Sequence, residues 1–377
     1  MAELYIGLMS GTSLDGVDGV LCRFDAQGRW AGVLGHVHQP FAAELRQALL
    51  ALQQAGPNEL HRAALAANAV ARAYARVCAE LLQHQQLPAS AIRAIGAHGQ
   101  TVRHQPGLHD GTGYTSQLNQ PALLAELSGI DVIADLRSRD VAAGGQGAPL
   151  VPPFHQAVFG PQDGAQALAR AVVNIGGISN LTLLADANQP LRGFDCGPGN
   201  ALLDHWCQQH LGHDYDAAGR WAASGTVLPE LLSALLADPY FAVAPPKSTG
   251  RDLFNVAWLD AALQRLATPA RAEDVQATLS QLTAQVIAAD LLRHAPQTSS
   301  LVVCGGGALN TDLMQRLKIA LPAVTVMPSD QLGLPVLQVE AAAFAWLARM
   351  HCHRQPANNP AVTGAAGLRV LGACYPA

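Results

Sequence analysis

Three glycine-rich turns each follow a short apolar segment and carry residue types that bind anions. They are G-T-S-L-D-G-V-D at 11–18, N-I-G-G-I-S-N at 174–180 and C-G-G-G-A-L-N at 304–310. Glycine has no Cβ, so main-chain N–H groups in such turns approach an anion closely and form a concave binding surface. A single turn of this kind is usually an ordinary tight connection. Three of them, spread over both halves of the chain, indicate a nucleotide bound between two domains.

The first turn also offers oxygen atoms to phosphate and to a metal ion. Its hydroxyl groups would donate hydrogen bonds to phosphate, and its two carboxylates are hard ligands of the kind that Mg²⁺ prefers. The metal ligands predicted are Asp15 and Asp18. The residues predicted to bind the nucleotide are Ser10, Gly11, Thr12, Ser13, Leu14, Asp15, Gly16, Val17, Asp18, Asn174, Gly176, Gly177, Gly305, Gly306, Gly307 and Asn310.

Familiar nucleotide and hydrolase motifs are missing from the sequence. G-x-x-x-x-G-K-[ST] is absent. The G-x-G runs that begin at Gly145, Gly197 and Gly305 have Leu150, Leu202 and Asn310 where G-x-G-x-x-G requires its third glycine. G-x-S-x-G and H-E-x-x-H are absent as well. P-loop, Rossmann, α/β-hydrolase and zinc-protease functions are therefore disfavoured.

Strand and helix patterns alternate along the chain and place each glycine turn directly after a strand. In the first half, strands are expected at 4–9, 17–23, 92–96 and 131–136, and helices at 41–54, 58–86 and from Pro121. A further apolar segment lies near 32–37. In the second half, strands are expected at 171–176, 180–185, 192–195, 300–304 and 324–327, and helices near 199–211, 228–236, 256–267, 274–294, 310–321 and 336–350. This alternation predicts an α/β fold. Each half opens with a strand, a glycine turn and a second strand, which suggests two related domains joined by the loop at 137–153.

Composition and charge narrow the class of protein. A chain of 377 residues, 50% of them apolar, is long enough for two domains with sizeable cores. The net charge of −5 and the lack of a basic run disfavour binding to nucleic acid or anionic lipid. Seven scattered cysteines without a C-x-x-C pair disfavour a disulfide framework. Without a signal-peptide pattern or a long apolar span, we expect a soluble, cytoplasmic protein with no membrane partner.

Taken together, the motifs resemble the anhydro-N-acetylmuramic acid kinase family of the sugar kinase/Hsp70/actin superfamily. The matching segments are G-L-M-S-G-T-S-L-D-G-V-D, A-H-G-Q-T, R-D-V-A-A-G-G-Q-G-A-P-L-V-P, N-I-G-G-I-S-N, G-F-D-C-G-P-G-N, P-K-S-T-G-R and V-T-G-A…L-G-A-C-Y-P-A. They run in order from about residue 4 to the end of the chain. Asn119, Gln120 and Ser138 depart from the family's pattern, near the expected sugar pocket.

The resemblance implies two actin-like (ribonuclease H-like) domains with a nucleotide cleft between them. Domain I would comprise 1–136 and the C-terminal segment from about 345, and domain II would comprise 137–344. The three glycine turns would be the phosphate-1, phosphate-2 and adenosine loops for ATP and Mg²⁺. The resemblance also implies a homodimer and a role in recycling the amino sugars of cell-wall peptidoglycan.

The family's substrate, 1,6-anhydro-N-acetylmuramic acid, has its sixth oxygen bonded to the anomeric carbon and therefore offers no free hydroxyl there. Water must attack the anomeric carbon while the departing oxygen takes the γ-phosphoryl group of ATP. The water needs a general base, and a carboxylate within hydrogen-bond reach suits this role. The resemblance assigns it to Asp195, at the end of a strand, whereas the structural alternative is an N-cap for the helix after Pro198, which Asn200 would otherwise cap.

Further polar residues are candidates for the sugar site. Glu340 is the only charge in a long apolar run and is either a second catalytic carboxylate or a solvent-facing helix residue. The predicted substrate-binding residues are His98, Gln100, Thr101, Asp140, Gln146, Lys247 and Arg251. For the residues at 98–101 the alternative is local bonding within a turn, and for Lys247 and Arg251 it is a solvated loop.

Three other functions share parts of this pattern. Another sugar kinase would share the fold and the ATP loops. An Hsp70- or actin-like switch module would share the three glycine turns but would hydrolyse ATP without sugar. A simple glycosidase would share the carboxylates but would open the anhydro ring without ATP.

Overall fold

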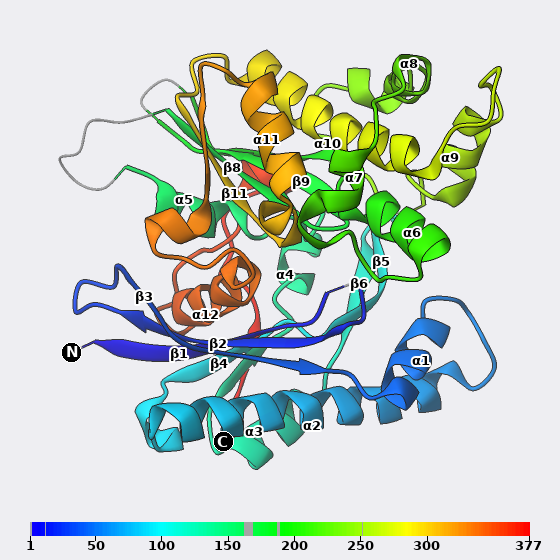
Figure 1. Cartoon of the computed structure of the whole chain (residues 1–377). Coiled ribbons are helices and arrows are strands. Elements are labelled where there is room, and N and C mark those ends of the chain that lie inside the picture. Colours follow the sequence, from blue (N-terminus) through cyan, green and yellow to red (C-terminus); the bar gives the residue numbers. More distant parts are fainter. Residues whose placement is uncertain (1, 12, 162–168, 187–188, 251) are drawn as a thin grey trace. The chain divides into compact units, whose positions relative to one another are not determined.

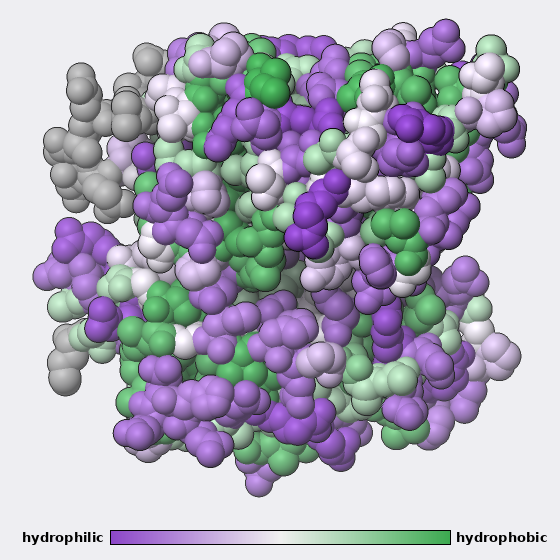
Figure 2. Space-filling model, viewed as in Figure 1, coloured by the Kyte–Doolittle hydropathy of each residue, from purple (hydrophilic) through white to green (hydrophobic). Residues whose placement is uncertain are grey.

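The computed structural model describes residues 2–11, 13–161, 169–186, 189–250 and 252–377. They form two compact units, each with its own sheet and core (Figure 1). Unit 1 comprises 1–158 and 338–377, and unit 2 comprises 159–337. Figure 2 shows hydrophilic side chains over most of the visible face, with apolar side chains in smaller patches. In the described part of the chain, no helix is both long and apolar enough to span a membrane.

The sheet of unit 1 is built around its first strand. Its strands are β1 (Glu3–Met9), β2 (Gly16–Phe24), β3 (Trp30–Pro40), β4 (Ala94–Ala97), β7 (Val132–Ala134) and β13 (Ala373–Tyr375), in the order β13-β7-β4-β1-β2-β3. β2 is antiparallel to both β1 and β3, whereas β4 and β7 continue parallel to β1. A separate hairpin pairs β5 (Gln100–Pro106) with β6 (Gly113–Leu118).

Helices cover the two faces of this sheet, as Figure 1 shows. Its helices are α1 (Ala43–Ala51), α2 (Glu59–Gln85), α3 (Pro121–Ser128), α4 (Ser138–Val141), α5 (Pro152–Phe159), α12 (Val339–Cys352) and α13 (Pro360–Thr363). α2 buries Val70, Tyr74, Val77 and Leu81, which recur every three or four residues along one stripe. α12 packs on β1 and β4, where Gly7 and Gly96 have no side chain and the helix backbone lies directly on the strands.

The sheet of unit 2 repeats the same plan. Its strands are β8 (Arg170–Ile175), β9 (Ile178–Leu183), β10 (Arg192–Pro198), β11 (Ser300–Cys304) and β12 (Thr325–Pro328), in the order β10-β9-β8-β11-β12. β9 is antiparallel to β8 and β10, and β11 and β12 run parallel to β8. In both units, two antiparallel strands follow on one side of the first strand and parallel strands lie on the other. This shared topology confirms the predicted α/β fold with two ribonuclease H-like units.

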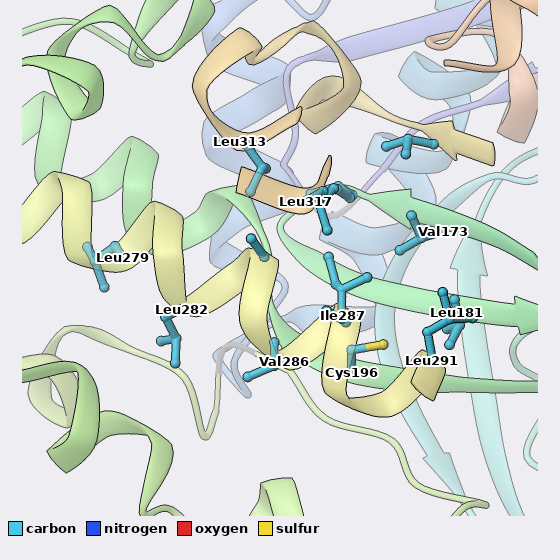
Figure 3. Close-up of a cluster of buried hydrophobic side chains, with 14 of the residues drawn as sticks. Val173, Leu181, Cys196, Leu279, Leu282, Val286, Ile287, Leu291, Leu313 and Leu317 are labelled. Carbon is cyan, nitrogen blue, oxygen red and sulfur yellow. The ribbon is translucent and has the colours of Figure 1, made fainter. Parts of the chain in front are cut away.

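One long helix, α10 (Ala272–His294), contributes many of the buried side chains in the core of unit 2. The helices of this unit are α6 (Asn200–Leu211), α7 (Arg220–Ser224), α8 (Pro229–Leu236), α9 (Val256–Leu263), α10 (Ala272–His294) and α11 (Thr311–Ala320). Short 3₁₀ turns occur at Ala89–Ala91, Ala217–Gly219, Pro239–Ala242, Gly306–Leu309 and Ser329–Leu332. Figure 3 shows Leu279, Leu282, Val286, Ile287 and Leu291 of α10 among side chains of the sheet and of α11.

The structure adds elements that the sequence patterns did not indicate. The predicted crossing loop at 137–153 contains α4 and the start of α5. Phe154 of α5 contacts Trp30 and Trp346, which holds this helix within unit 1. α12 likewise contacts the unit 1 sheet from its first turn. For these reasons the units divide near 159 and 338, whereas the sequence suggested 137 and about 345.

Candidate active site

The first glycine turn connects β1 to β2 in unit 1. Leu14 has a φ of 58°, and its N–H donates to the Gly11 carbonyl at 3.2 Å, which closes the turn. The Asp15 Oδ1 atom accepts from the Ser13 hydroxyl at 2.8 Å and from the Gly16 N–H at 3.0 Å. The predicted phosphate ligand Thr12 lies outside the described residues.

A second segment, residues 98–100, holds this turn in place. The Ser10 hydroxyl is buried, lies 2.8 Å from the Tyr74 hydroxyl and donates to the Gly99 carbonyl at 3.1 Å. The Gly99 N–H donates to Tyr74, and the Gln100 amide donates to the Gly11 carbonyl at 2.9 Å. Ser10 and Gln100, predicted as ligands, therefore shape the turn from within. Tyr74, 64 residues after Ser10, carries no sequence signal beyond its place on the buried face of α2.

A buried histidine and an arginine lie behind the same turn. His98 lies with its Nδ1 atom 3.3 Å from the Ser10 carbonyl, and its Nε2 atom accepts from Arg137 at 2.9 Å. Burial, together with the Arg137 charge, lowers the pKa of His98 to about 3, so the ring is neutral at neutral pH. Burial lowers the pKa of Arg137 to about 10, with Glu340 opposing this shift. Sequence reasoning missed Arg137, although it lies in the same segment as the unusual Ser138.

Glu340, on the first turn of α12, is accessible to solvent even though protein atoms surround it closely. This partial loss of hydration raises the pKa of its carboxyl group, and the negative charges of Asp18 and Asp15 raise it further. The Arg137 charge acts in the opposite direction. The charges that act on Glu340 therefore come from Arg137 and from two aspartates of the first glycine turn.

Of the predicted metal ligands, Asp15 immediately precedes β2 and Asp18 lies within that strand. The Asp18 Oδ1 atom accepts from His36 Nε2 and His38 Nδ1, each at 3.0 Å. Among the described residues, no group of three or more His, Cys, Asp or Glu side chains is arranged to hold a metal ion. Mg²⁺ commonly uses one or two carboxylates together with phosphate oxygens and water, and Asp15 and Asp18 are donors of that kind.

The other predicted sugar ligands of unit 1 differ in their exposure. Asp140 is fully buried and accepts from Asn358, Thr363 and the Gly147 N–H, so it ties the C-terminal segment to the Gly-rich loop. Gln146 is exposed between the glycines of this loop. Thr101 is half-buried, and its hydroxyl accepts from Gln117.

The second and third glycine turns touch one another in unit 2. A Cβ at Gly305, which has a φ of 77°, would overlap the Asn174 side chain and the Ile175 carbonyl. The Asn200 amide donates to that same carbonyl at 3.1 Å. Asn310 caps α11 by accepting from the Leu313 N–H at 3.0 Å. Two turns that are far apart in sequence therefore lie against one another.

Asp195 lies in β10, close to the segment 247–249. Its Oδ2 atom accepts from the Ser248 hydroxyl at 2.9 Å and from the Thr249 N–H at 3.0 Å. Burial raises the pKa of Asp195, whereas the two hydrogen bonds and the Lys247 charge lower it. The N-cap of α6 is Gly199, without a side-chain cap, so neither Asp195 nor Asn200 caps this helix.

Lys247 and Arg251 were predicted as contacts of phosphate or sugar. Only 2% of the Lys247 side chain is exposed, and its ammonium lies 2.9 Å from the Asp290 carboxylate. Arg251 lies outside the described residues. The segment 247–249 thus contacts Asp195 from one side and the interior of unit 2 from the other.

Comparison with known proteins gives a consistent set of relatives. The family model for anhydro-N-acetylmuramic acid kinase matches residues 3–377. The chain is 62% identical over 379 residues to a protein of that name from Variovorax paradoxus, covering 100% of this chain and 99% of the relative. It is 58% identical over 377 residues to one from Bordetella pertussis, covering 100% and 96%.

Solved structures with a similar fold are more distant. Component A of (R)-2-hydroxyglutaryl-CoA dehydratase from Acidaminococcus fermentans has a TM-score of 0.49 and 12% identity, covering 91% of this chain and 96% of that one. A ROK family glucokinase from Streptomyces griseus, in complex with glucose and AMPPNP, has a TM-score of 0.39 and 14% identity, covering 92% and 99%.

Proposed function

The chain belongs to the anhydro-N-acetylmuramic acid kinase family, and from this we propose its reaction. It is an ATP-dependent sugar kinase. Its acceptor is 1,6-anhydro-N-acetylmuramic acid, and its product is N-acetylmuramic acid 6-phosphate. The match over residues 3–377, at 62% identity to one relative, is the observation that carries this proposal. A place in peptidoglycan recycling follows from the substrate, whereas a homodimer and a cytoplasmic location remain predictions.

The reaction couples a hydrolysis to a phosphoryl transfer. The water oxygen forms a bond to the anomeric carbon as the bond from that carbon to the sixth oxygen breaks. The sixth oxygen forms a bond to the γ-phosphorus as the bond from phosphorus to the ADP oxygen breaks. The water proton passes to a carboxylate. Because phosphorus takes up the charge of the leaving oxygen, no separate general acid is needed at that oxygen.

Asp195 is the general base in this proposal. The hydrogen bonds from Ser248 and Thr249 fix Oδ2, and Oδ1 has no hydrogen-bond partner among the described residues. One oxygen is therefore held while the other is available to accept a proton from water. The raised pKa of Asp195 also makes its carboxylate a stronger base than an ordinary surface aspartate.

In this proposal, the three glycine turns bind ATP. The turn at 11–18 and residues 174–177 bind phosphate through main-chain N–H groups, and residues 305–310 bind adenosine. Asp15 and Asp18 would hold Mg²⁺, which would neutralise phosphate charge. Glu340 is the second carboxylate of the sugar site, and Arg137 beside it favours its ionised form.

Product analysis in ¹⁸O water tests the reaction. The protein is incubated with the anhydro sugar and ATP-Mg²⁺, and the products are examined by mass spectrometry and NMR. We expect the label at the anomeric hydroxyl and phosphate on the sixth oxygen. Ring opening without ATP would identify a glycosidase, and ATP hydrolysis without sugar would identify a switch ATPase; either result contradicts the proposal.

The variant Asp195→Asn tests the base. It keeps the shape of the side chain but removes its basicity, so kcat should fall by about 10²–10⁴-fold while ATP affinity stays unchanged. Turnover measured by ADP release and ATP affinity measured by calorimetry separate the two effects. Near-normal turnover in this variant would remove Asp195 from the role.

A further inference from the structure

Lys247 is one of only two lysines in the chain, and its charge is buried in unit 2. Its ammonium lies 2.9 Å from the Oδ2 atom of Asp290, and the two side chains are 2% and 4% exposed. Taking two ions out of water is unfavourable unless their geometry compensates closely. Stability alone therefore does not explain why this ion pair is buried, which suggests a functional role for it.

Aromatic rings complete the surroundings of this ammonium. The nitrogen lies 5.0 Å from the ring centre of Tyr240 and 5.9 Å from that of Phe194. Ring faces attract cations, more strongly where water is excluded. Asp290 projects from α10, which also contributes to the core of unit 2, so the ammonium is bound to a core helix.

The same residues contact Asp195 on its other side. The Asp195 N–H donates to the Lys247 carbonyl at 3.1 Å, and the Tyr240 hydroxyl donates to the Asp195 carbonyl at 2.8 Å. The next two residues after Lys247 provide both donors to Asp195 Oδ2. Fixing the Lys247 side chain therefore fixes the segment that orients the carboxylate.

We propose that Lys247 is a positioning residue for Asp195. Its ammonium, held by Asp290 and by the rings of Tyr240 and Phe194, anchors the segment 247–249, which immobilises one carboxylate oxygen and leaves the other for water. This inference rests on the proposed role of Asp195 as the base. In this inference, Lys247 acts through Asp195 and does not contact the substrate.

The buried charge has an electrostatic consequence as well. The Lys247 ammonium opposes the effect of burial on the pKa of Asp195 and so keeps the base ionised at lower pH. The other titratable or charged groups around Lys247 and Asp195 are Tyr240, Cys196, Asp290, His294 and Arg192. Burial raises the pKa of Tyr240 and Cys196 and lowers that of His294, so all three are neutral near neutral pH. Lys247 is therefore the cation that acts directly on Asp195.

The experiment compares the pH dependence of kcat/KM for the anhydro sugar in three variants. Lys247→Met combined with Asp290→Leu removes both charges and leaves neither ion unpaired. Lys247→Arg keeps a cation beside Asp290. Lys318→Met, at the exposed second lysine on α11, is the matched control. Thermal unfolding of each variant is recorded in parallel.

In the double variant, we expect the acid limb of the profile to move to higher pH. On the acid side of the profile, the ratio of wild-type to variant kcat/KM should be about tenfold larger than on the alkaline plateau. This is the change expected if the pKa of the base rises by about one unit. Lys247→Arg should retain most of the wild-type profile, and Lys318→Met should retain all of it. The KM for ATP should not change in any variant.

Other results would overturn the proposal. One is an unshifted acid limb in a folded double variant. Another is a loss that appears only as a raised KM for the sugar, which would make Lys247 a substrate ligand. If the double variant does not fold, Lys247→Arg decides, because a shifted acid limb in that variant would also contradict the proposal. A wild-type protein without sugar-dependent turnover would instead contradict the proposed function.

Discussion

Asp195 and Glu340 are both carboxylates with raised pKa values, and in both the loss of hydration among protein atoms is the main cause. Their partners differ. Two hydrogen-bond donors and the Lys247 charge favour the ionised form of Asp195. Arg137 alone favours ionisation of Glu340, against two nearby aspartates. At the residue scale, the pKa of each carboxyl group therefore results from a different balance between lost hydration and nearby charges.

The raised pKa of Asp195 predicts the pH dependence of the reaction. The base works in its deprotonated form, so activity is present above its pKa in the folded protein and is lost as pH falls through that value. Because this pKa lies above that of an ordinary aspartate, the acid limb of kcat/KM should appear at correspondingly higher pH. A profile that stays flat well below the ordinary pKa of a carboxyl group would exclude Asp195 as the base.

Tyr74 provides a second prediction at this scale. Tyr74→Phe removes the hydroxyl that lies against Ser10 and accepts from Gly99, and so loosens the first glycine turn. We expect a stability loss of about 1–2 kcal/mol and a several-fold higher KM for ATP. The matched control is Tyr5→Phe, because the buried Tyr5 hydroxyl interacts with Cys352 and not with the turn. Equal effects of both variants on KM would contradict this role.

At the scale of elements, α12 is positioned by two glycines. A Cβ at Gly7 would overlap the Ala341 carbonyl, and a Cβ at Gly96 would overlap the Phe344 carbonyl. The helix therefore lies closer to β1 and β4 than any side chain would allow. Since Glu340 begins this helix, the two strands determine where its carboxylate lies.

Gly7→Ala tests this packing. The added methyl group meets main chain, which cannot move aside, so the variant should be destabilised by about 1–3 kcal/mol and should lose activity by displacing α12. The control is Gly56→Ala, where the nearest atom belongs to the flexible end of Arg62. Denaturant unfolding and turnover of both variants check the prediction, and an unchanged Gly7→Ala protein would refute it.

At the scale of the whole molecule, the two units share a sheet topology but differ in how the chain builds them. Unit 2 is one continuous segment, 159–337, with its own core. Unit 1 needs 338–377 as well, because α12 covers one face of its sheet. The two parts of unit 1 are therefore separated in sequence by the whole of unit 2.

This difference predicts how fragments behave. A fragment of residues 159–337 should unfold cooperatively on its own, whereas residues 1–158 alone should aggregate because the face of β1 and β4 is uncovered. Neither should phosphorylate sugar, since each fragment lacks one or more of the glycine turns that are proposed to bind ATP. Circular dichroism and denaturant titration check this, and a well-folded 1–158 fragment would show that α12 is dispensable.

The sequence by itself determined the α/β class, the glycine turns and the family. Strand and helix patterns identify these features because period and apolar content are local properties, and motif order is visible without coordinates. Weak local patterns were missed. The hairpin of β5 and β6 is polar and half-exposed, and α4 and α5 lie in a segment whose glycines and prolines suggested a loop.

Only the tertiary structure decided which side chains act together. Tyr74 reaches Ser10 across 64 residues, and Asp290 reaches Lys247 from another element. Burial also affects how charged residues are interpreted. Asp140 and Lys247 look like ligands in the sequence, but both side chains are buried and have partners inside the fold. The physical reason is that burial, pairing and pKa depend on neighbours brought together by folding, which no local pattern records.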